Sequence, residues 1–542
     1  MASLANVGQP NLLLIGGKVL TMDENESIVE AVAIRGNRII AVGSSNELES
    51  LVGSETKVID LKGRILIPGL IDSHTHPLIA AAKLLQLDCR AQDITEIKDL
   101  QRAVKEWAEK VGPGKWVRGS SYNDSKLKEK RQITRWELDE VSLNNPVYLT
   151  SDTGHQSVVN SLALNLAGIT RDTIDPDGGK IDRDLNGEPT GLLYETAQNY
   201  ISKQLSKYDV NELKLALKQV LQQYTEWGVT STHDASATSE GIHCYQQLLR
   251  EGFKQVRISL MVRIENPEKS LSILESIGIE SGFGDDWLKI MSLKIMGDGS
   301  GAGGTSCVYS PQYRGPGGLG MWTTNPDEQE RFVEKAQQLG IRVSIHAIGD
   351  RGIDAALDAI EKAQKSYPYV DMRHRIEHNS CCTVKQLNRI KELGVTPSSS
   401  VGYMYQLGDQ YAENYGPERC SSLHPHRTMK NMGIVAGGNS DAPVAYYSPF
   451  VQIYTAVTRK SCSGQVVGPE ESINVMDALR IYTWNGAYLS KEENVKGSIE
   501  PGKLADMVII DRDILECSVE DIKETRVLAT IVDGNIVYSN IF

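Results

Sequence analysis

Short apolar segments that end in polar residues recur eight times between residues 65 and 440. Helix-compatible segments, such as 328–340 and 352–366, lie between most of them. This alternation is typical of βα units with parallel strands. Eight such units predict an α/β fold, a (β/α)8 TIM barrel, whose catalytic groups gather at the C-terminal ends of the strands. The predicted strands are 65–76, 229–234, 257–263, 293–299, 343–348, 374–379, 394–399 and 434–440.

Both ends of the chain are rich in strand and turn signals. Residues 11–68 contain β-rich runs separated by Gly-Gly, Gly-Asn and Lys-Gly turns, and the C-terminal end has a hairpin signal at Asp533-Gly534. We predict one small composite β-sandwich domain, formed by residues 1–68 together with 491–542. Two unrelated β-hairpins are the alternative.

The barrel itself is predicted over residues 69–490. Its first two strands are separated by roughly 150 residues, far more than a βα connection needs. We therefore predict an inserted subdomain over about 80–225, with helices at 98–111 and 210–227. A Gly- and Pro-rich segment at 299–320 is interpreted as a flap over the barrel mouth.

Composition argues against several function classes. The 542-residue chain has 57 basic and 70 acidic residues, and its net charge of −13 disfavours nucleic acid or an anionic membrane as the main partner. No apolar run reaches the roughly 18 residues that span a bilayer. The N-terminus, MASLANVGQPNLLLIGG, lacks the basic region of a signal peptide, and the eight cysteines lack zinc-finger spacing. A reduced, cytoplasmic protein is expected.

Metal-binding types of residue stand at the ends of five predicted strands. His74 and His76 are two residues apart in a strand, so their side chains share one face and can bind one metal ion. An isolated strand histidine is more often a hydrogen-bonded core residue, but a barrel brings all strand ends to one mouth. The other residues at those ends are Lys294, His346, His378 and Asp441.

The chain resembles the amidohydrolase superfamily of metal-dependent hydrolases. Within it, the chain is most similar to amidohydrolase family 3, which includes N-substituted formamide deformylases. The resemblance covers nearly the whole chain, from LLLIGGKVLTMD and IPGLIDSHTHP to GSIEPGKLADMVIID. The motifs that mark this branch are GHQSVVNSLALNLAGI, GEPTGLLYETA, LKIMGDGS, IHAIGDRG, HRIEHN and GNSDAPV.

The resemblance implies a set of metal ligands. His74 and His76 would bind the more buried ion, with Asp441 completing its coordination, and His346 and His378 would bind a second ion. The implied cofactor is a divalent metal, with Zn²⁺ as the first choice and one or two ions per chain. A homodimer is a further expectation from the resemblance.

Lys294 is implied to bridge the two ions as a carboxylated lysine. An ammonium group is repelled by a dication, whereas a carbamate is an anionic oxygen ligand that such a metal accepts. The alternative is an unmodified lysine paired with Asp298, which would leave a site with one ion, as in other branches of the superfamily.

The chemistry follows from these ligands. A bound divalent metal lowers the pKa of its water from about 15.7 toward about 7. Asp441 is the predicted catalytic residue, which takes a proton from the water and returns it to the leaving amine. The candidates for substrate contact are His155 in the inserted subdomain, Glu195 in the pocket wall and His233 at the end of the second strand.

Three functions remain open at this point. The first is hydrolysis of a non-peptide C–N bond in a small molecule, an N-formyl or N-acyl amide. The second is hydrolysis of a cyclic amide, or deamination of a small heterocycle. The third is a non-catalytic regulatory or binding role, which the complete ligand set with Asp441 disfavours because a binding module needs no proton carrier.

Overall fold

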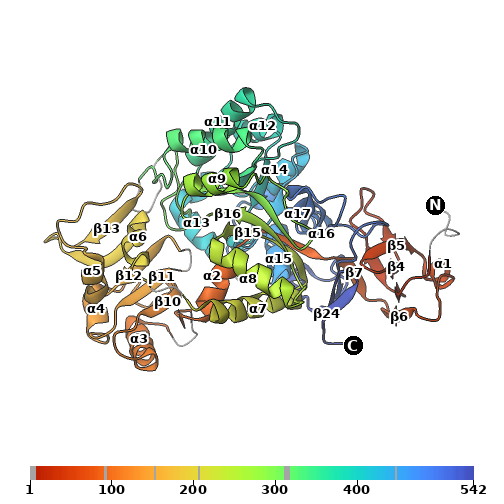
Figure 1. Ribbon diagram of the computed structural model, residues 1–542, viewed down its shortest axis with the longest axis horizontal. Helices are drawn as coiled ribbons and strands as arrows, with labels where there is room; N and C mark the ends of the chain where they lie inside the picture. Colours follow the sequence, from red (N-terminus) through yellow and green to blue (C-terminus); the bar gives the residue numbers. More distant parts are fainter. Residues whose placement is uncertain are drawn as a thin grey trace.

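The computed structural model describes residues 8–90, 94–151, 154–205, 208–310, 318–445 and 448–541. Its centre is a parallel eight-stranded sheet, curled into a nearly closed barrel in the order β21-β20-β19-β18-β17-β16-β15-β8 (Figure 1). A backbone hydrogen bond of 2.9 Å from the N–H of Asp441 to the carbonyl of His74 joins the first and last βα units. The prediction of a (β/α)8 barrel is confirmed. The barrel strands are β8 (Leu70–Thr75), β15 (Val229–Ala237), β16 (Arg257–Val262), β17 (Leu288–Met296), β18 (Val343–Ala347), β19 (Arg375–His378), β20 (Thr396–Ser399) and β21 (Gly437–Gly438).

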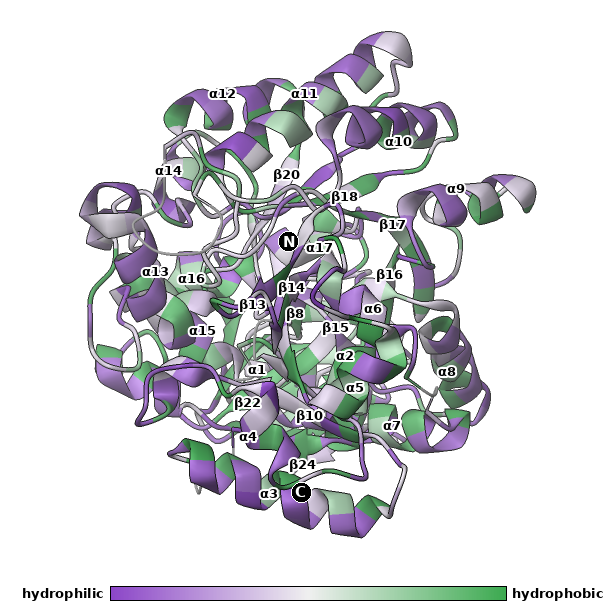
Figure 2. Cartoon of the chain, turned by 90° about the vertical axis from the view of Figure 1, so that its left-hand side faces the viewer, coloured by the Kyte–Doolittle hydropathy of each residue, from purple (hydrophilic) through white to green (hydrophobic). Residues whose placement is uncertain are grey.

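Amphipathic helices cover the outside of the barrel. In α11 (Asp350–Ser366) the buried residues Ile353, Leu357 and Ile360 recur every three or four positions, which places them on one face. That face packs with α10 (Pro326–Gln338) over the barrel strands. Figure 2 shows the resulting alternation of hydrophilic and hydrophobic residues along these helices. None of the described helices is long and apolar enough to cross a membrane.

The predicted first strand, 65–76, is two strands in the structure. β7 (Ile65–Pro68) pairs with strands of a terminal sheet, and β8 enters the barrel after a break at Gly69. A Cβ atom on Gly69 would lie 2.1 Å from Oγ1 of Thr230, so only glycine allows this approach of β7 and β8 to the neighbouring strand. His76 lies just beyond β8, at the N-cap of the next helix.

Both ends of the chain form two further sheets, and their apolar side chains pack into one shared core. One sheet has the order β5-β4-β1-β6, and the other has the order β24-β23-β22-β7-β2-β3, in which C-terminal strands pair with β7. The strands are β1 (Leu12–Ile15), β2 (Lys18–Leu20), β3 (Ile28–Val29), β4 (Ala31–Arg35), β5 (Arg38–Gly43), β6 (Lys57–Asp60), β22 (Met507–Ile510), β23 (Val527–Val532) and β24 (Asn535–Ser539).

The segment between β8 and β15 forms a six-stranded sheet beside the barrel, in the order β13-β14-β12-β11-β10-β9 (Figure 1). One predicted helix of this segment is α3 (Ile97–Val111), which packs on the inserted sheet. Its strands are β9 (Leu87–Asp88), β10 (Val117–Tyr122), β11 (Val147–Ser151), β12 (Gln156–Val159), β13 (Gly179–Arg183) and β14 (Pro189–Glu195).

The two ends of the predicted insertion lie on the barrel instead. α2 (Pro77–Leu84) packs against α7 (Val210–Glu226), and α7 also packs against β15 and β23. The apolar face of α7 includes Leu217 and Leu221, which join the largest core cluster of the barrel. The sequence predicted a helix at 210–227, but not which sheet this helix covers.

The predicted flap at 299–320 is tied down at both of its described ends. The N–H of Val308 donates to the carbonyl of Leu319 at 2.9 Å, and the N–H of Cys307 donates to Oδ2 of Asp298 at 2.9 Å. The middle of this segment, 311–317, lies outside the described residues, as do residues 1–7.

Candidate active site at the barrel mouth

A cavity of ≈ 790 Å³ lies at the C-terminal ends of the barrel strands. The barrel strands form one part of its wall, and residues of the inserted sheet, including Arg118 and Tyr148, form another. α2 and α7 add apolar side chains such as Leu78 and Leu213. Eight of the nine residues predicted for the site line this cavity: His74, His76, His155, Glu195, Lys294, His346, His378 and Asp441.

Three of these residues are close enough to share a metal ion. One ligand atom each from His74, His76 and Asp441 lies within 4.8 Å of the others. Oδ1 of Asp441 is 2.8 Å from Nε2 of His76 and 3.5 Å from Nε2 of His74. Oδ1 is buried and makes no hydrogen bond within the described chain, while Oδ2 accepts a short hydrogen bond from the hydroxyl of Tyr403. Two imidazoles and a carboxylate oxygen directed at one point fit a divalent ion.

His74 is held in position by a residue that sequence reasoning missed. Nδ1 of His74 lies 2.5 Å from Oε2 of Glu377, so Nδ1 carries the proton and Nε2 presents its lone pair to the site. Glu377 in turn accepts hydrogen bonds of 2.7 and 2.9 Å from Arg375. All three side chains are buried. The available signal was HRIEHN, in which Arg375 and Glu377 share a strand face.

Burial favours the neutral form of His74, His346 and His378, which is the form that binds metal. Burial and the nearby Lys294 lower the pKa of His74 to about 4, and burial lowers the pKa values of His346 and His378 well below the usual value. Burial alone would raise the pKa of Asp441, but the contacts with His76 and His74 outweigh it and hold this pKa below its ordinary range. These three imidazoles are therefore neutral beside an ionised Asp441.

His346 and His378 lie beside the first three residues without joining their group. The ring of His378 is 4.6 Å from that of His74 and 4.5 Å from that of His346, measured between centroids. Nε2 of His346 is 3.2 Å from the carbonyl oxygen of Gly299, and Nδ1 of His378 is 2.9 Å from Oγ of Ser400. Among the described residues, only the group of His74, His76 and Asp441 meets the distances for a shared ion.

Lys294 is a buried amine near the metal-binding group. Its Nζ atom is 3.4 Å from Nε2 of His74, and burial lowers its pKa to about 8. It forms no ion pair within the described chain, so the alternative of a pair with Asp298 is wrong. Asp298 instead accepts hydrogen bonds from the backbone N–H groups of Ile348 and Gly349 at 3.0 and 2.9 Å, and from that of Cys307.

His155 and Glu195 form a pair in the wall contributed by the inserted sheet. Nδ1 of His155 is 2.8 Å from Oε2 of Glu195, and Oε1 of Glu195 accepts a hydrogen bond of 2.6 Å from Thr305. Burial opposes protonation of His155, but Glu195 outweighs it and raises the pKa. The ring of His155 lies 5.9 Å from that of His346, so the pair faces the metal-binding side chains across the cavity.

His233 lies elsewhere. It is fully buried, and its Nδ1 lies 2.8 Å from a guanidinium nitrogen of Arg375. It is absent from the described residues that line the cavity, whereas its neighbour Asp234 is present. The prediction of a substrate contact is therefore wrong for His233, because its buried ring packs against Arg375 and not into the cavity.

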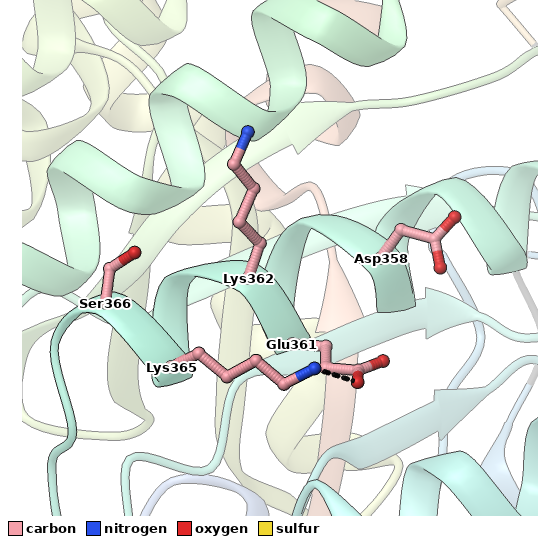
Figure 3. Close-up of a pocket in the computed structure, with 5 residues that line it drawn as sticks. All are labelled: Asp358, Glu361, Lys362, Lys365 and Ser366. Atoms are coloured by element: carbon pink, nitrogen blue, oxygen red, sulfur yellow. Dashed lines mark hydrogen bonds and ion pairs between the residues drawn. The ribbon is translucent and has the colours of Figure 1, made fainter.

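A second depression, of ≈ 460 Å³, lies on the outer surface of α11 (Figure 3). Its charged side chains are already paired, since Lys365 contacts Glu361 at 2.6 Å and Lys362 contacts Glu330 at 2.5 Å. One helix face with paired, solvated charges has neither the depth nor the convergent polar groups of a ligand site. The candidate site is therefore the cavity at the barrel mouth.

The barrel, the inserted sheet and the group of His74, His76 and Asp441 fit a metal-dependent hydrolase. Known proteins that are similar to this chain support the same class. The chain is 27% identical to a metal-dependent hydrolase of Pyrococcus horikoshii, with a TM-score of 0.76 over 94% of this chain and 99% of the other. It is 30% identical to the N-substituted formamide deformylase of Arthrobacter pascens over 97% of this chain and 98% of the relative. It is also 30% identical to Protein LONG AFTER FAR-RED 3 of Arabidopsis thaliana, over 97% and 91%.

The model of the amidohydrolase family matches residues 57–538. The chain belongs to this family of metal-dependent hydrolases, as its sequence motifs predicted.

Proposed function

We propose that this protein is an amidohydrolase that cleaves a non-peptide C–N bond in a small molecule, an N-formyl or N-acyl amide. The observation that carries the proposal is the convergence of His74, His76 and Asp441 on one point at the cavity floor. The similarity to a formamide deformylase supports the substrate class.

The first metal ion, with Zn²⁺ as our first choice, would be held by His74, His76 and Asp441. When bound, such an ion supplies Lewis acidity that polarises a carbonyl group and lowers the pKa of a water molecule. Glu377 fixes the ring of His74 and leaves its Nε2 free for the ion. Tyr403 donates to one oxygen of Asp441 and keeps the other oxygen directed into the site.

Asp441 is the proposed proton carrier. Asp441 lines the cavity, and its Oδ1 atom is directed toward the two histidines, where it can accept a proton from the attacking water. The same carboxyl group can then protonate the amine as the C–N bond breaks. His155, which Glu195 favours in its protonated form, is proposed to donate to the carbonyl oxygen of the substrate.

A second ion is proposed between His346, His378 and a carboxylated Lys294. Carboxylation requires a neutral amine, and the burial of Lys294 without an ion pair in the described chain favours that form. A Lys294→Met variant, prepared with bicarbonate beside the parent, tests this step by metal content. Loss of about one ion per chain relative to the parent would support the bridge, and equal content would show that Lys294 is no ligand.

A product assay tests the reaction class. The metal-loaded protein is incubated with N-substituted formamides, N-acyl amines, cyclic amides and aminated heterocycles, and carboxylic acid, amine and ammonia are measured. Release of formate or another carboxylic acid together with an amine is the expected result. Release of ammonia, or ring opening alone, would favour the heterocycle alternative, and no product from any class would favour the non-catalytic one.

Asp441→Asn provides the matched test of mechanism. This change removes the proton acceptor but nearly preserves the shape of the side chain, so we expect kcat to fall by about 10²–10⁴-fold. Metal content must be measured on the same preparation, since Asp441 is also a proposed ligand. Unchanged kcat at full metal content would contradict its role as proton carrier.

We further propose that the protein acts as a homodimer in the cytoplasm on a small-molecule substrate, without nucleic acid or membrane partners. Light scattering coupled to size exclusion would measure the mass in solution.

A further inference from the structure

Arg263 is an arginine of the cavity wall whose side chain has no acidic partner among the described residues. Arg263 directly follows β16 and lines the cavity, where its side chain is half-buried. Its backbone N–H donates to the carbonyl of Ala237 at 3.0 Å, which fixes the main chain at this point. Within the described chain its guanidinium group makes no ion pair and no hydrogen bond, and burial lowers its pKa with no acidic group to oppose the effect.

Apart from Lys294, whose amine is proposed to be carboxylated, the other cations of the described wall have contacts of their own. Lys83 donates to Oγ of Ser121 at 3.2 Å, and the guanidinium of Arg118 lies 4.5 Å from the centre of the Tyr208 ring. The carboxylate of Asp234 accepts hydrogen bonds from Tyr245 and from the backbone of Ser236. Arg263 is therefore the cation that a ligand in the cavity can pair with at the lowest cost.

The strand register places Arg263 next to the reacting centre. Val262 of β16 pairs with Leu293 of β17, so Arg263 and Lys294 are neighbours at the ends of adjacent strands. A partly buried cation without a counter-ion is costly, because it has lost part of its hydration and gained no opposite charge. A ligand that supplies this charge would recover the cost on binding.

We infer that Arg263 recognises a carboxylate on the substrate, which makes the substrate an N-acyl compound with an acidic group close to the scissile bond. The planar guanidinium offers two parallel N–H donors, which match the two oxygens of one carboxylate. Apolar side chains of the same wall, including Leu78, Val210 and Leu213, would contact the remainder of the molecule. This inference rests on the proposed function for the reaction and adds the charge of the substrate.

Binding without turnover provides the first test. Calorimetry compares 3-phenylpropanoate with 3-phenyl-1-propanol, a neutral molecule without an amide bond, on the metal-loaded parent and on Arg263→Gln. We expect the parent to bind the carboxylate at least tenfold more tightly than the alcohol, and the variant to lose most of that ratio. A parent without this preference would overturn the inference. A variant that keeps the preference would also overturn it, since the metal alone would then be the anion site.

Two controls separate Arg263 from other causes. Arg118→Gln removes another cation from the wall, and an equal loss in this variant would mean that net charge, not Arg263, selects the anion. Metal content of Arg263→Gln is compared with that of Lys294→Met. Loss of metal in both would assign Arg263 to a carboxylated Lys294 and would overturn the substrate role.

Turnover provides the second test. N-formylphenylalanine and N-formyl-2-phenylethylamine differ only by the carboxylate, and formate release gives kcat/KM for each. We expect the ratio of the two kcat/KM values to favour the acid and to fall at least tenfold in Arg263→Gln. If neither compound is hydrolysed, the proposed formamide class fails, while the calorimetry still decides whether Arg263 binds carboxylates.

Discussion

At the level of single residues, a series of hydrogen bonds between buried side chains runs from Arg375 through Glu377 to His74. These hydrogen bonds position His74 as a proposed metal ligand. Two hydrogen bonds from Arg375 fix Glu377, and Glu377 fixes the ring of His74. A metal-ligating histidine depends on such a partner for its tautomer and its orientation, and loss of the partner weakens metal binding by about 10–100-fold.

Glu377→Gln tests this arrangement. The variant leaves Arg375 with less negative charge, so we expect both a loss of stability and a metal affinity reduced by about 10–100-fold. The matched control is Glu492→Gln, because Glu492 is also buried and pairs with Lys289 and Lys496 at 2.6 and 3.0 Å, outside the metal site. The control should lose stability without losing metal affinity. Equal metal affinity in the parent and Glu377→Gln, measured by competition with a chelator, would contradict the role of Glu377.

Sequence alone identified most residues at the cavity because strand ends and a period of two are local patterns. His74 and Lys294 are examples, since a strand end in a barrel points at the mouth wherever the rest of the chain lies. Glu377 and Tyr403 were missed because each acts through a contact with a residue far away in the chain. The role predicted for His233 was wrong because its ring contacts Arg375, a residue far away in the chain.

At the level of secondary-structure elements, the structure corrects the two ends of the first βα unit. The strand predicted at 65–76 divides at Gly69 between a terminal sheet and the barrel, and α7 covers the barrel, not the inserted sheet. Both features depend on what packs against the element. An apolar run predicts that an element is buried, but it does not predict which sheet the element packs against.

Arg257 joins the barrel to the C-terminal strands. It begins β16, is buried, and its guanidinium contacts Asp506 at 2.7 Å and Asp533 at 2.9 Å. Arg257→Met should lower the free energy of unfolding by about 3–5 kcal/mol, because it leaves Asp506 buried without its cation. The measurement is urea unfolding.

Arg389→Met is the control for Arg257→Met. Arg389 also contacts acidic residues, Asp358 at 2.7 Å and Glu361 at 2.8 Å, but it lies at the surface. Its loss should cost about 1 kcal/mol or less. Equal costs for the two variants would contradict the claim that Arg257 couples barrel and terminal sheets.

At the scale of the whole molecule, buried neutral histidines predict sensitivity to acid. In His374, Nδ1 accepts a hydrogen bond of 3.0 Å from the backbone of Val343, and Nε2 is 2.6 Å from Oε1 of Gln337, so the neutral ring is fully bonded. Burial lowers its pKa to about 3 from the ordinary 6.5. The unfolded chain binds this proton first, so stability is lost as the pH falls from about 6.5 toward 3.

Buried acids oppose this trend. Burial raises the pKa values of Asp72 and Asp298 to about 7, and their contribution to stability grows as the pH falls from there toward 3.8. Comparison of the parent with His374→Gln isolates the contribution of His374 to the pH dependence of the free energy of unfolding. Between pH 6 and 4.5 the parent should lose up to about 1.4 kcal/mol per pH unit more than the variant, measured by urea unfolding. Parallel pH profiles would contradict a neutral His374.

We propose that the barrel mouth holds a divalent metal through His74, His76 and Asp441. The most direct measurement is metal content per chain by plasma mass spectrometry, on the parent and on His76→Ala. We expect at least one divalent ion per parent chain and a loss of about one ion in the variant. A folded parent without metal, or a variant with the full content of the parent, would contradict it.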